Sequence, residues 1–161
     1  MSEGKGKDVV ANNLVLATHR GFASGIRSAL SLILGNVDAV RTVEVDADTP
    51  MDSVCTQIGE ALSKFPPDKP VFLVTDIPGG SPTQAVMKEA TTFPNAVCIT
   101  GLNLGMLLEL ATMPLDGSDM QDAKNMARDA VQSSVVSMGL LEDLAASADG
   151  MRSEDTESDE L

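Results

Sequence analysis

The chain has 161 residues, of which 43% are hydrophobic, and a formal net charge of −13. This length favours one domain with a single core, and the negative charge argues against nucleic acid or an anionic membrane surface as a partner, because both would repel it. No apolar stretch approaches the ~20 residues that cross a bilayer, and the N-terminus has no signal-peptide core, so we expect a cytoplasmic protein.

Four short apolar runs alternate with helical patterns along the chain. They cover residues 13–17, 40–45, 71–75 and 96–100. This alternation predicts a mostly parallel sheet with helices on both faces, which is a doubly wound α/β fold. With four strands and short loops we expect the flavodoxin-like strand order 2-1-3-4, in which the loops after the first and third strands become neighbours.

Capping signals mark the starts of three predicted helices. Thr49 precedes Pro50, a cap followed by a first-turn proline. Ser81 opens the string Ser-Pro-Thr-Gln, in which the serine can cap the helix and Gln84 can complete a capping box. A second Ser-x-x-Gln pattern begins at Ser118.

The C-terminal part of the chain differs in composition from the rest. Residues 135–138, Val-Val-Ser-Met, predict a short extended piece, either an edge strand or a strand exchanged with a second copy. From residue 142 onward eight acidic residues outnumber a single arginine, so we expect residues 141–161 to be an acidic, disordered tail. The folded domain would span residues 12–140, after a flexible segment at 1–11.

The two cysteines, Cys55 and Cys98, lie in a helical and a strand pattern, and we expect both to be small buried residues without a disulfide. A zinc site needs three or four ligands, which one histidine and two separated cysteines do not supply. We therefore expect neither a metal nor a cofactor.

The only histidine, His19, follows the first apolar run, where a residue of an open α/β sheet points into the ligand crevice. A neutral imidazole can attack phosphorus with one ring nitrogen if the other holds the proton. A carboxylate bonded to that proton fixes the tautomer, and Asp76, directly after the third run, is placed for this role. The pair predicts phosphoryl chemistry.

The residues after Asp76 form a glycine turn that enters a helix. Gly79, Gly80 and Ser81 lead into a helix N-terminus, whose amides and dipole favour anions. Each signal also has an ordinary interpretation, because a lone histidine often has no role, an aspartate can form a turn, and glycine pairs mark turns generally.

Three strings together resemble the IIA component of mannose-family sugar phosphotransferase systems, over about residues 12–138. They are Thr-His at residues 18–19, Thr-Asp-Ile-Pro-Gly-Gly-Ser-Pro at residues 75–82, and Gly-Leu-Asn-Leu-Gly-Met-Leu at residues 101–107. The resemblance implies a phosphotransferase subunit that accepts a phosphoryl group from phospho-HPr on His19. It would pass that group to a IIB component, which serves the membrane components IIC and IID.

The resemblance also implies roles for the neighbouring residues. Asp76 matches the aspartate that hydrogen-bonds the active histidine, and Gly79, Gly80 and Ser81 match the turn on the phosphate side. Members of the family are commonly homodimers that exchange a C-terminal strand, a role that residues 135–138 could fill.

The chain departs from the family pattern beside the histidine and in two loops. Arg20 stands where a glycine or another small residue is usual, and it could either pair with the phosphoryl group or extend into solvent. Gly105 replaces a usual proline, and Pro78 a bulky apolar residue. These departures bear on the choice of partner more than on the transfer.

Two alternatives remain open at this point. One is the related phosphohistidine subunit that serves dihydroxyacetone kinase, although the Gly-Gly-Ser-Pro string favours the sugar system. The other is a ligand-binding or regulatory module on the same fold, without turnover. The chain holds no information on which sugar a complete system would carry.

Overall fold

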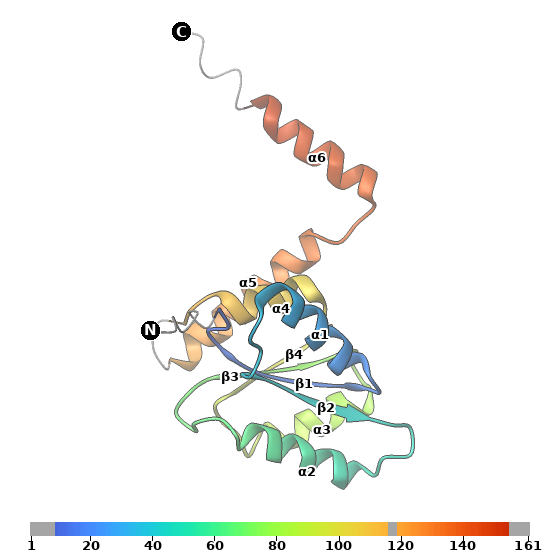
Figure 1. The fold of residues 1–161 in the computed structure, drawn as a ribbon, viewed down its shortest axis with the longest axis vertical. Helices are drawn as coiled ribbons and strands as arrows, with labels where there is room; N and C mark the ends of the chain where they lie inside the picture. Colours follow the sequence, from blue (N-terminus) through green and yellow to red (C-terminus); the bar gives the residue numbers. More distant parts are fainter. Residues whose placement is uncertain (1–8, 116–118, 155–161) are drawn as a thin grey trace, which may run out of the picture.

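The sheet of the computed structural model, which describes residues 9–115 and 119–154, has four parallel strands in the order β2-β1-β3-β4 (Figure 1). The strands are β1 Asn13–His19, β2 Val40–Val45, β3 Val71–Thr75 and β4 Ala96–Thr100. This order confirms the predicted doubly wound fold. β1 continues past the predicted end at residue 17, so His19 is the last residue of the strand.

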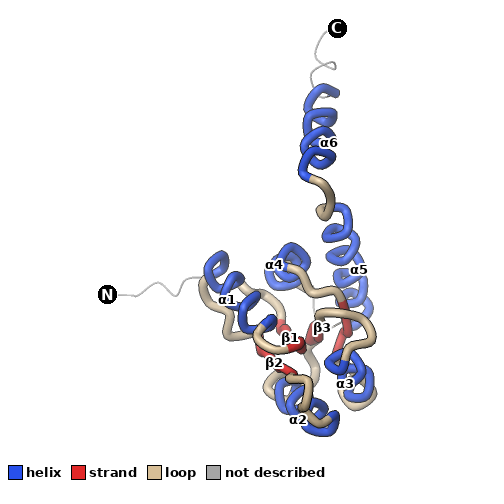
Figure 2. The backbone as a smooth tube through the Cα atoms, turned by 90° about the vertical axis from the view of Figure 1, so that its right-hand side faces the viewer, coloured by secondary structure: helices blue, strands red, loops and turns tan. Residues whose placement is uncertain are grey.

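Helices cover both faces of the sheet (Figure 2). One face carries α1 Phe22–Leu34, α4 Leu104–Thr112 and α5 Met120–Val136, the other carries α2 Met51–Leu62 and α3 Ser81–Glu89, and α6 Leu141–Glu154 extends away from the sheet. Among the helices of residues 9–115 and 119–154, none is long and apolar enough to cross a membrane.

The central strand β1 is apolar on both faces because both faces are covered. Leu14 and Leu16 face the core on the side of α1, α4 and α5, whereas Val15 and Ala17 face α2 and α3. All four side chains are fully buried. A strand covered on both sides needs a continuous apolar run rather than alternation, which is why this strand is evident in the sequence.

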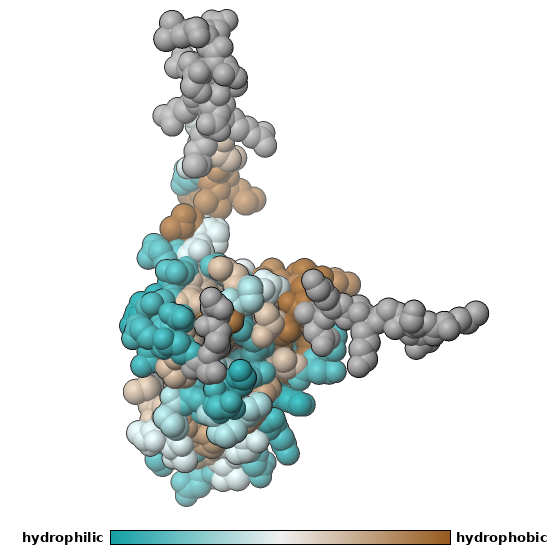
Figure 3. Space-filling model, turned by 90° about the vertical axis from the view of Figure 1, so that its left-hand side faces the viewer, coloured by the Kyte–Doolittle hydropathy of each residue, from teal (hydrophilic) through white to brown (hydrophobic). Residues whose placement is uncertain are grey.

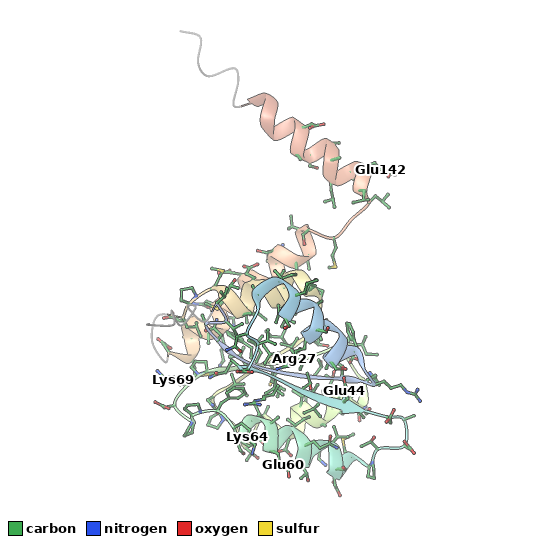
Figure 4. The ribbon with its side chains drawn as sticks, viewed as in Figure 1. Arg27, Glu44, Glu60, Lys64, Lys69 and Glu142 are labelled. Carbon is green, nitrogen blue, oxygen red and sulfur yellow. The ribbon has the colours of Figure 1, made fainter. Side chains whose placement is uncertain are left out.

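Arg27 of α1 lies against the outer edge of β2, which is an edge strand of the sheet (Figure 4). Its Nε donates to the carbonyl oxygen of Val40 at 2.8 Å, and its Nη2 donates to that of Val37 at 3.1 Å. These hydrogen bonds tie α1 to the chain that enters β2. The first of them also occupies a carbonyl group of β2 on an edge that has no neighbouring strand.

The end of α5 occupies the place of the strand predicted at residues 135–138. Val135 and Val136 are helical, and the amide of Ser137 still bonds a carbonyl oxygen one turn earlier at 3.1 Å. Helical spacing of the buried positions carries the helix this far. Those positions are Ala123, Ala127, Ala130 and Ser134. The prediction of an edge or exchanged strand is therefore wrong for this structure.

Residues 141–154 form helix α6, although we expected a disordered tail from residue 141 onward. Its first turn carries Glu142 and Asp143, which suit the positive end of the helix dipole. Its apolar residues 141, 144, 145 and 148 recur at helical spacing. Our expectation of disorder rested on the number of charges and did not take this spacing into account. The remainder of the expected tail, residues 155–161, lies outside the described residues.

Large apolar side chains are exposed where α5 passes into α6 (Figure 3), namely Val135, Val136, Met138, Leu140 and Leu141.

The two cysteines differ in environment. Cys55 of α2 is buried, as predicted, and both thiols are free. Cys98 is exposed, which corrects our expectation, because it lies on the edge strand β4.

Two of the predicted caps also differ from the structure. α2 begins at Met51 with Pro50 in the N-cap position, and the hydroxyl of Thr49 instead accepts a hydrogen bond from the Asp46 amide at 3.0 Å. α5 is capped by Asp119, whose carboxylate accepts from the Gln121 amide at 2.8 Å. Ser118, the predicted cap, lies outside the described residues.

Candidate active site

His19 and Asp76 lie side by side at the carboxyl ends of the two central strands. His19 ends β1, and Asp76 directly follows β3. The parallel register pairs Ala17 with Thr75, which brings the two strand ends level. Between these strands the chain order of the sheet reverses, the position at which open α/β sheets form their ligand crevice.

One carboxylate oxygen of Asp76 holds both the backbone and the ring of His19. Oδ2 accepts from the His19 amide at 2.9 Å and lies 2.8 Å from His19 Nδ1. Oδ1 accepts from the Ile77 amide at 2.9 Å. The Asp76 side chain is 9% exposed, whereas that of His19 is 42% exposed. The buried carboxylate is therefore fixed by backbone amides, while the imidazole stays accessible.

The hydrogen bonds around Asp76 also keep it ionised. Burial raises the pKa of this carboxyl group. Hydrogen bonds from the His19 amide, the His19 ring and the Ile77 amide, together with the attraction of the imidazole, lower the pKa by more than burial raises it. The pKa of Asp76 therefore lies below its ordinary value. An ionised carboxylate is an acceptor only, so we assign the proton of the neutral imidazole to Nδ1. Nε2 then carries the free lone pair.

Gly80 packs directly against the imidazole ring. A Cβ atom built at Gly80 would lie 2.7 Å from His19 Cε1 and 3.4 Å from Nε2, which is too close for the first pair. The φ angle of Gly80 is −68°, a value that any residue adopts, so contact with the ring is the reason for glycine here. Gly79 differs, because its φ of 78° lies in the left-handed region that favours glycine.

The turn after Asp76 ends at the start of α3. Gly80 is the N-cap residue of this helix and Ser81 its first residue, so the predicted serine cap is wrong. Gln84 does not complete a capping box either, because its side-chain amide donates to the Gly79 carbonyl oxygen at 3.0 Å. No side chain caps α3, which leaves its first amides without a side-chain partner.

The N-terminus of α1 also lies at this end of the sheet, but side chains occupy two of its first amides. Thr18 Oγ1 accepts from the Ala23 amide at 2.9 Å, and Glu44 Oε1 accepts from the Ser24 amide at 2.8 Å (Figure 4). These two amides are therefore not available to an anion beside His19. The sequence analysis did not identify Thr18 or Glu44 as caps, because both act across gaps in the sequence.

Thr83 fixes the shape of the turn from within α3. Its hydroxyl donates to the Ile77 carbonyl oxygen at 2.6 Å and lies 2.8 Å from the hydroxyl of the buried Thr75. The sequence analysis did not single out either threonine. The pairing links the end of β3 to the helix that follows it.

Arg20 is the one non-glycine residue with a positive φ in the described part of the chain, at 43°. Its Nε lies 3.2 Å from Asp46 Oδ1, in the loop after β2, and its side chain is 81% exposed. The sequence analysis left two interpretations of Arg20 open, a contact with the phosphoryl group or a side chain that extends into solvent. It did not identify Asp46. The relevant signal was available, because Asp46 follows β2 as Asp76 follows β3.

The third string of the resemblance, at residues 101–107, supports the site from the side of β4. The amides of Gly101 and Leu102 both donate to the Thr75 carbonyl oxygen at 3.0 Å. Asn103 caps α4, with its Oδ1 accepting from the Met106 amide at 2.9 Å. These bonds hold the β4 loop against the end of β3.

Comparison with known proteins adds to this geometry. Residues 13–128 match the family model described as the PTS system fructose IIA component. The fold is similar to the mannose/sorbose specific IIA subunit of the phosphotransferase system from Enterococcus faecalis, at 22% identity and a TM-score of 0.68, covering 80% of this chain and 96% of that chain. It is also similar to the phosphotransferase system component EIIA from Streptococcus agalactiae, at 22% identity and a TM-score of 0.67, covering 76% of this chain and 93% of that chain.

A third solved structure is the PTS IIA protein associated with the fucose utilization operon from Streptococcus pneumoniae. It is 19% identical with a TM-score of 0.64, and the match covers 84% of this chain and 98% of that chain. At these identities the solved structures establish the fold, whereas the family model establishes the family.

The contact between Gly80 and His19 predicts that Gly80→Ala displaces the ring without unfolding the chain. The new methyl group would overlap His19 Cε1, so the ring must turn and its bond to Asp76 must weaken. Nitrogen NMR of the imidazole should report the change as a shift of both ring signals. Gly25→Ala in α1 is the matched control, because a Cβ there has nothing within 4 Å. Unaltered ring signals in Gly80→Ala would contradict the contact.

The lowered pKa of Asp76 predicts how this residue contributes to stability as the pH changes. A carboxyl group whose pKa is lower in the folded than in the unfolded chain stabilises the fold above its unfolded pKa, about 3.9, and this contribution is lost as the pH falls through the folded value. The difference in unfolding free energy between the wild type and Asp76→Asn should therefore be constant near pH 5 and shrink below about pH 4. Urea denaturation at a series of pH values measures it, with Asp48→Asn as an exposed control. A difference that stays the same down to pH 2 would count against the lowered pKa.

Proposed function

This chain belongs to the family of PTS fructose IIA components, and from that premise we propose that it is a phosphocarrier subunit of a mannose-family sugar phosphotransferase system, which accepts its phosphoryl group on His19. The observation that carries the proposal is the 2.8 Å contact between His19 Nδ1 and Asp76 Oδ2. It leaves Nε2 as an accessible nucleophile on a partly exposed ring.

The transfer step can be written from these atoms. The lone pair of His19 Nε2 attacks the phosphorus of phospho-HPr, forming a new N–P bond. The N–P bond of the donor breaks, and its electron pair returns to the donor imidazole, which leaves neutral. The Nδ1 proton stays on His19 throughout, and the ionised Asp76 stabilises the positive charge that develops on the ring.

Transfer between two phosphohistidines is close to balanced in energy, so the site must mainly align the two rings and stabilise the spread charge of the phosphoryl group. The uncapped start of α3 supports this role for Gly79, Gly80 and Ser81, whose amides and helix dipole favour an anion. Pro82 has no amide to contribute. No metal or cofactor enters the step.

In the second half of the cycle His19 is the phosphoryl donor. The phosphoryl group on His19 is attacked by a IIB component, and His19 recovers its neutral form.

The proposal includes the cytoplasmic location and the homodimer expected from the resemblance. Because residues 135 and 136 are helical in this structure, a dimer would require an interface other than the strand that we expected there.

The proposed acceptor role of His19 predicts that His19→Ala abolishes phosphorylation. Wild type incubated with phosphoenolpyruvate, enzyme I and HPr should gain one acid-labile phosphoryl group, because the chain has a single histidine. Mass spectrometry under alkaline conditions measures the adduct, and thermal unfolding checks that the variant is folded. A variant that still labels stoichiometrically would overturn the assignment, and an unlabelled wild type would favour a binding module.

Asp76→Ala should slow phosphorylation without abolishing it. The variant loses the group that fixes the tautomer and orientation of the ring but keeps the nucleophile, so we expect a decrease of about 10²-fold in rate. Rapid-quench kinetics with phospho-HPr measures the rate, and Asp48→Ala, in the loop after β2, serves as a control for general loss of negative charge. A rate equal to that of the wild type would make Asp76 a purely structural residue.

A further inference from the structure

Arg20 and Asp46 are the first residues beyond the ends of two adjacent strands. The register pairs His19 with Val45, and the Arg20 amide donates to the Val45 carbonyl oxygen at 2.9 Å. The guanidinium then reaches Asp46, with Nε 3.2 Å from Oδ1. The ion pair therefore lies on the β2 side of His19, whereas Asp76 and Gly80 lie on the β3 side.

The backbone of Arg20 is unfavourable for an arginine. Its φ of 43° lies in the left-handed region, where a Cβ atom crowds the carbonyl oxygen and glycine is at no disadvantage. A strained residue at a functional site is a reason to look for a role of its side chain. The Asp46 pair alone does not supply one, because an ion pair between two exposed side chains contributes little to stability.

We propose that Arg20 changes partner when His19 is phosphorylated, leaving Asp46 and binding the phosphoryl group on His19 Nε2. Asp46 is then a positioning residue, which keeps the guanidinium beside the site while no anion is bound. This inference rests on the proposed function of His19, and it adds a charge exchange that is specific to this chain.

The exchange is favourable on electrostatic grounds. A phosphoryl group carries more negative charge than a carboxylate and offers oxygens that the guanidinium fork can bind in pairs. The chain as a whole carries a net charge of −13, which opposes a further anion at the surface, while the α3 terminus supplies only partial positive charge. A full positive charge next to His19 offsets that repulsion.

The exchange is also feasible in geometry. Adjacent Cα atoms lie about 3.8 Å apart, so the long arginine side chain starts close to that of His19. The Arg20 side chain is 81% exposed and can turn without displacing the core. Two other acidic groups nearby have partners of their own, because Glu44 accepts from the Ser24 amide and Asp76 from His19.

The experiment uses the full chain phosphorylated with phosphoramidate, a small donor that does not depend on HPr. The first readout is the Nε–H signal of Arg20 in nitrogen–proton NMR, assigned from its loss in Arg20→Lys. Before phosphorylation the signal should shift in Asp46→Asn relative to the wild type. After phosphorylation it should move to a new position that is the same in both proteins. A signal that does not move on phosphorylation would overturn the exchange.

The second readout is the rate of phosphorylation by phosphoramidate. Arg20→Gln should slow it about tenfold, the loss expected for one charge-assisted contact, and Arg20→Lys should restore part of it. Asp46→Asn should increase the rate, because Arg20 no longer has a competing partner. Opposite effects of the two changes argue against a purely structural pair, for which both variants would be slower, and the NMR readout distinguishes an exchange from the general effect of removing a charge. Arg41→Gln, an exposed arginine on β2, is the matched control.

The two proposals fail in different ways. If phosphoramidate phosphorylates His19 and Arg20 moves, but phospho-HPr does not phosphorylate the chain, the exchange holds and the proposed function is overturned. If phospho-HPr phosphorylates His19 while the Arg20 signal and rates do not change, the function holds and the exchange is overturned. If neither donor phosphorylates His19, both are overturned.

Discussion

The bond between the His19 ring and Asp76 is the interaction on which the rest of the site depends, and it exists because β1 and β3 are neighbours in the sheet. The two residues are 57 positions apart in sequence, and the crossover through β2 and α2 brings the strand ends level. Once the carboxylate is fixed by the His19 and Ile77 amides, the ring has one orientation and one tautomer. Gly80 can then approach the ring closely, and α3 begins directly after it at Ser81.

The hydrogen-bond donors that the crevice offers also depend on which helix amides already have a side-chain partner. α1 and α3 both start at this end of the sheet, and both start without a capping side chain from their own N-cap residue. Thr18 of β1 and Glu44 of β2 bond the Ala23 and Ser24 amides of α1, so these two donors are not available to an anion. The difference between two otherwise similar helix ends is produced by two side chains that are not themselves part of the proposed chemistry.

Local patterns in the sequence predicted the strand order and the pairing of His19 with Asp76, because buried parallel strands leave continuous apolar runs and the crossover rule then fixes their neighbours. Contacts through space were not predictable in the same way. The close approach of Gly80 to the ring depends on how the turn after Asp76 packs against His19, which no short string encodes, whereas Asp46 could have been noticed from its position after β2. Ser81 and residues 135–138 were misassigned because a serine before a proline and a pair of valines each fit two local structures, and packing chose between them.

The hydrogen bonds of Arg27 have a consequence for how copies of this protein meet one another. An edge strand with open carbonyl groups can recruit a strand from another molecule and begin aggregation. The guanidinium occupies the Val40 oxygen at the start of the β2 edge and the Val37 oxygen just before it, and its charge must be desolvated before another strand could align there. A single arginine on a helix thus hinders strand pairing at the point where the β2 edge begins.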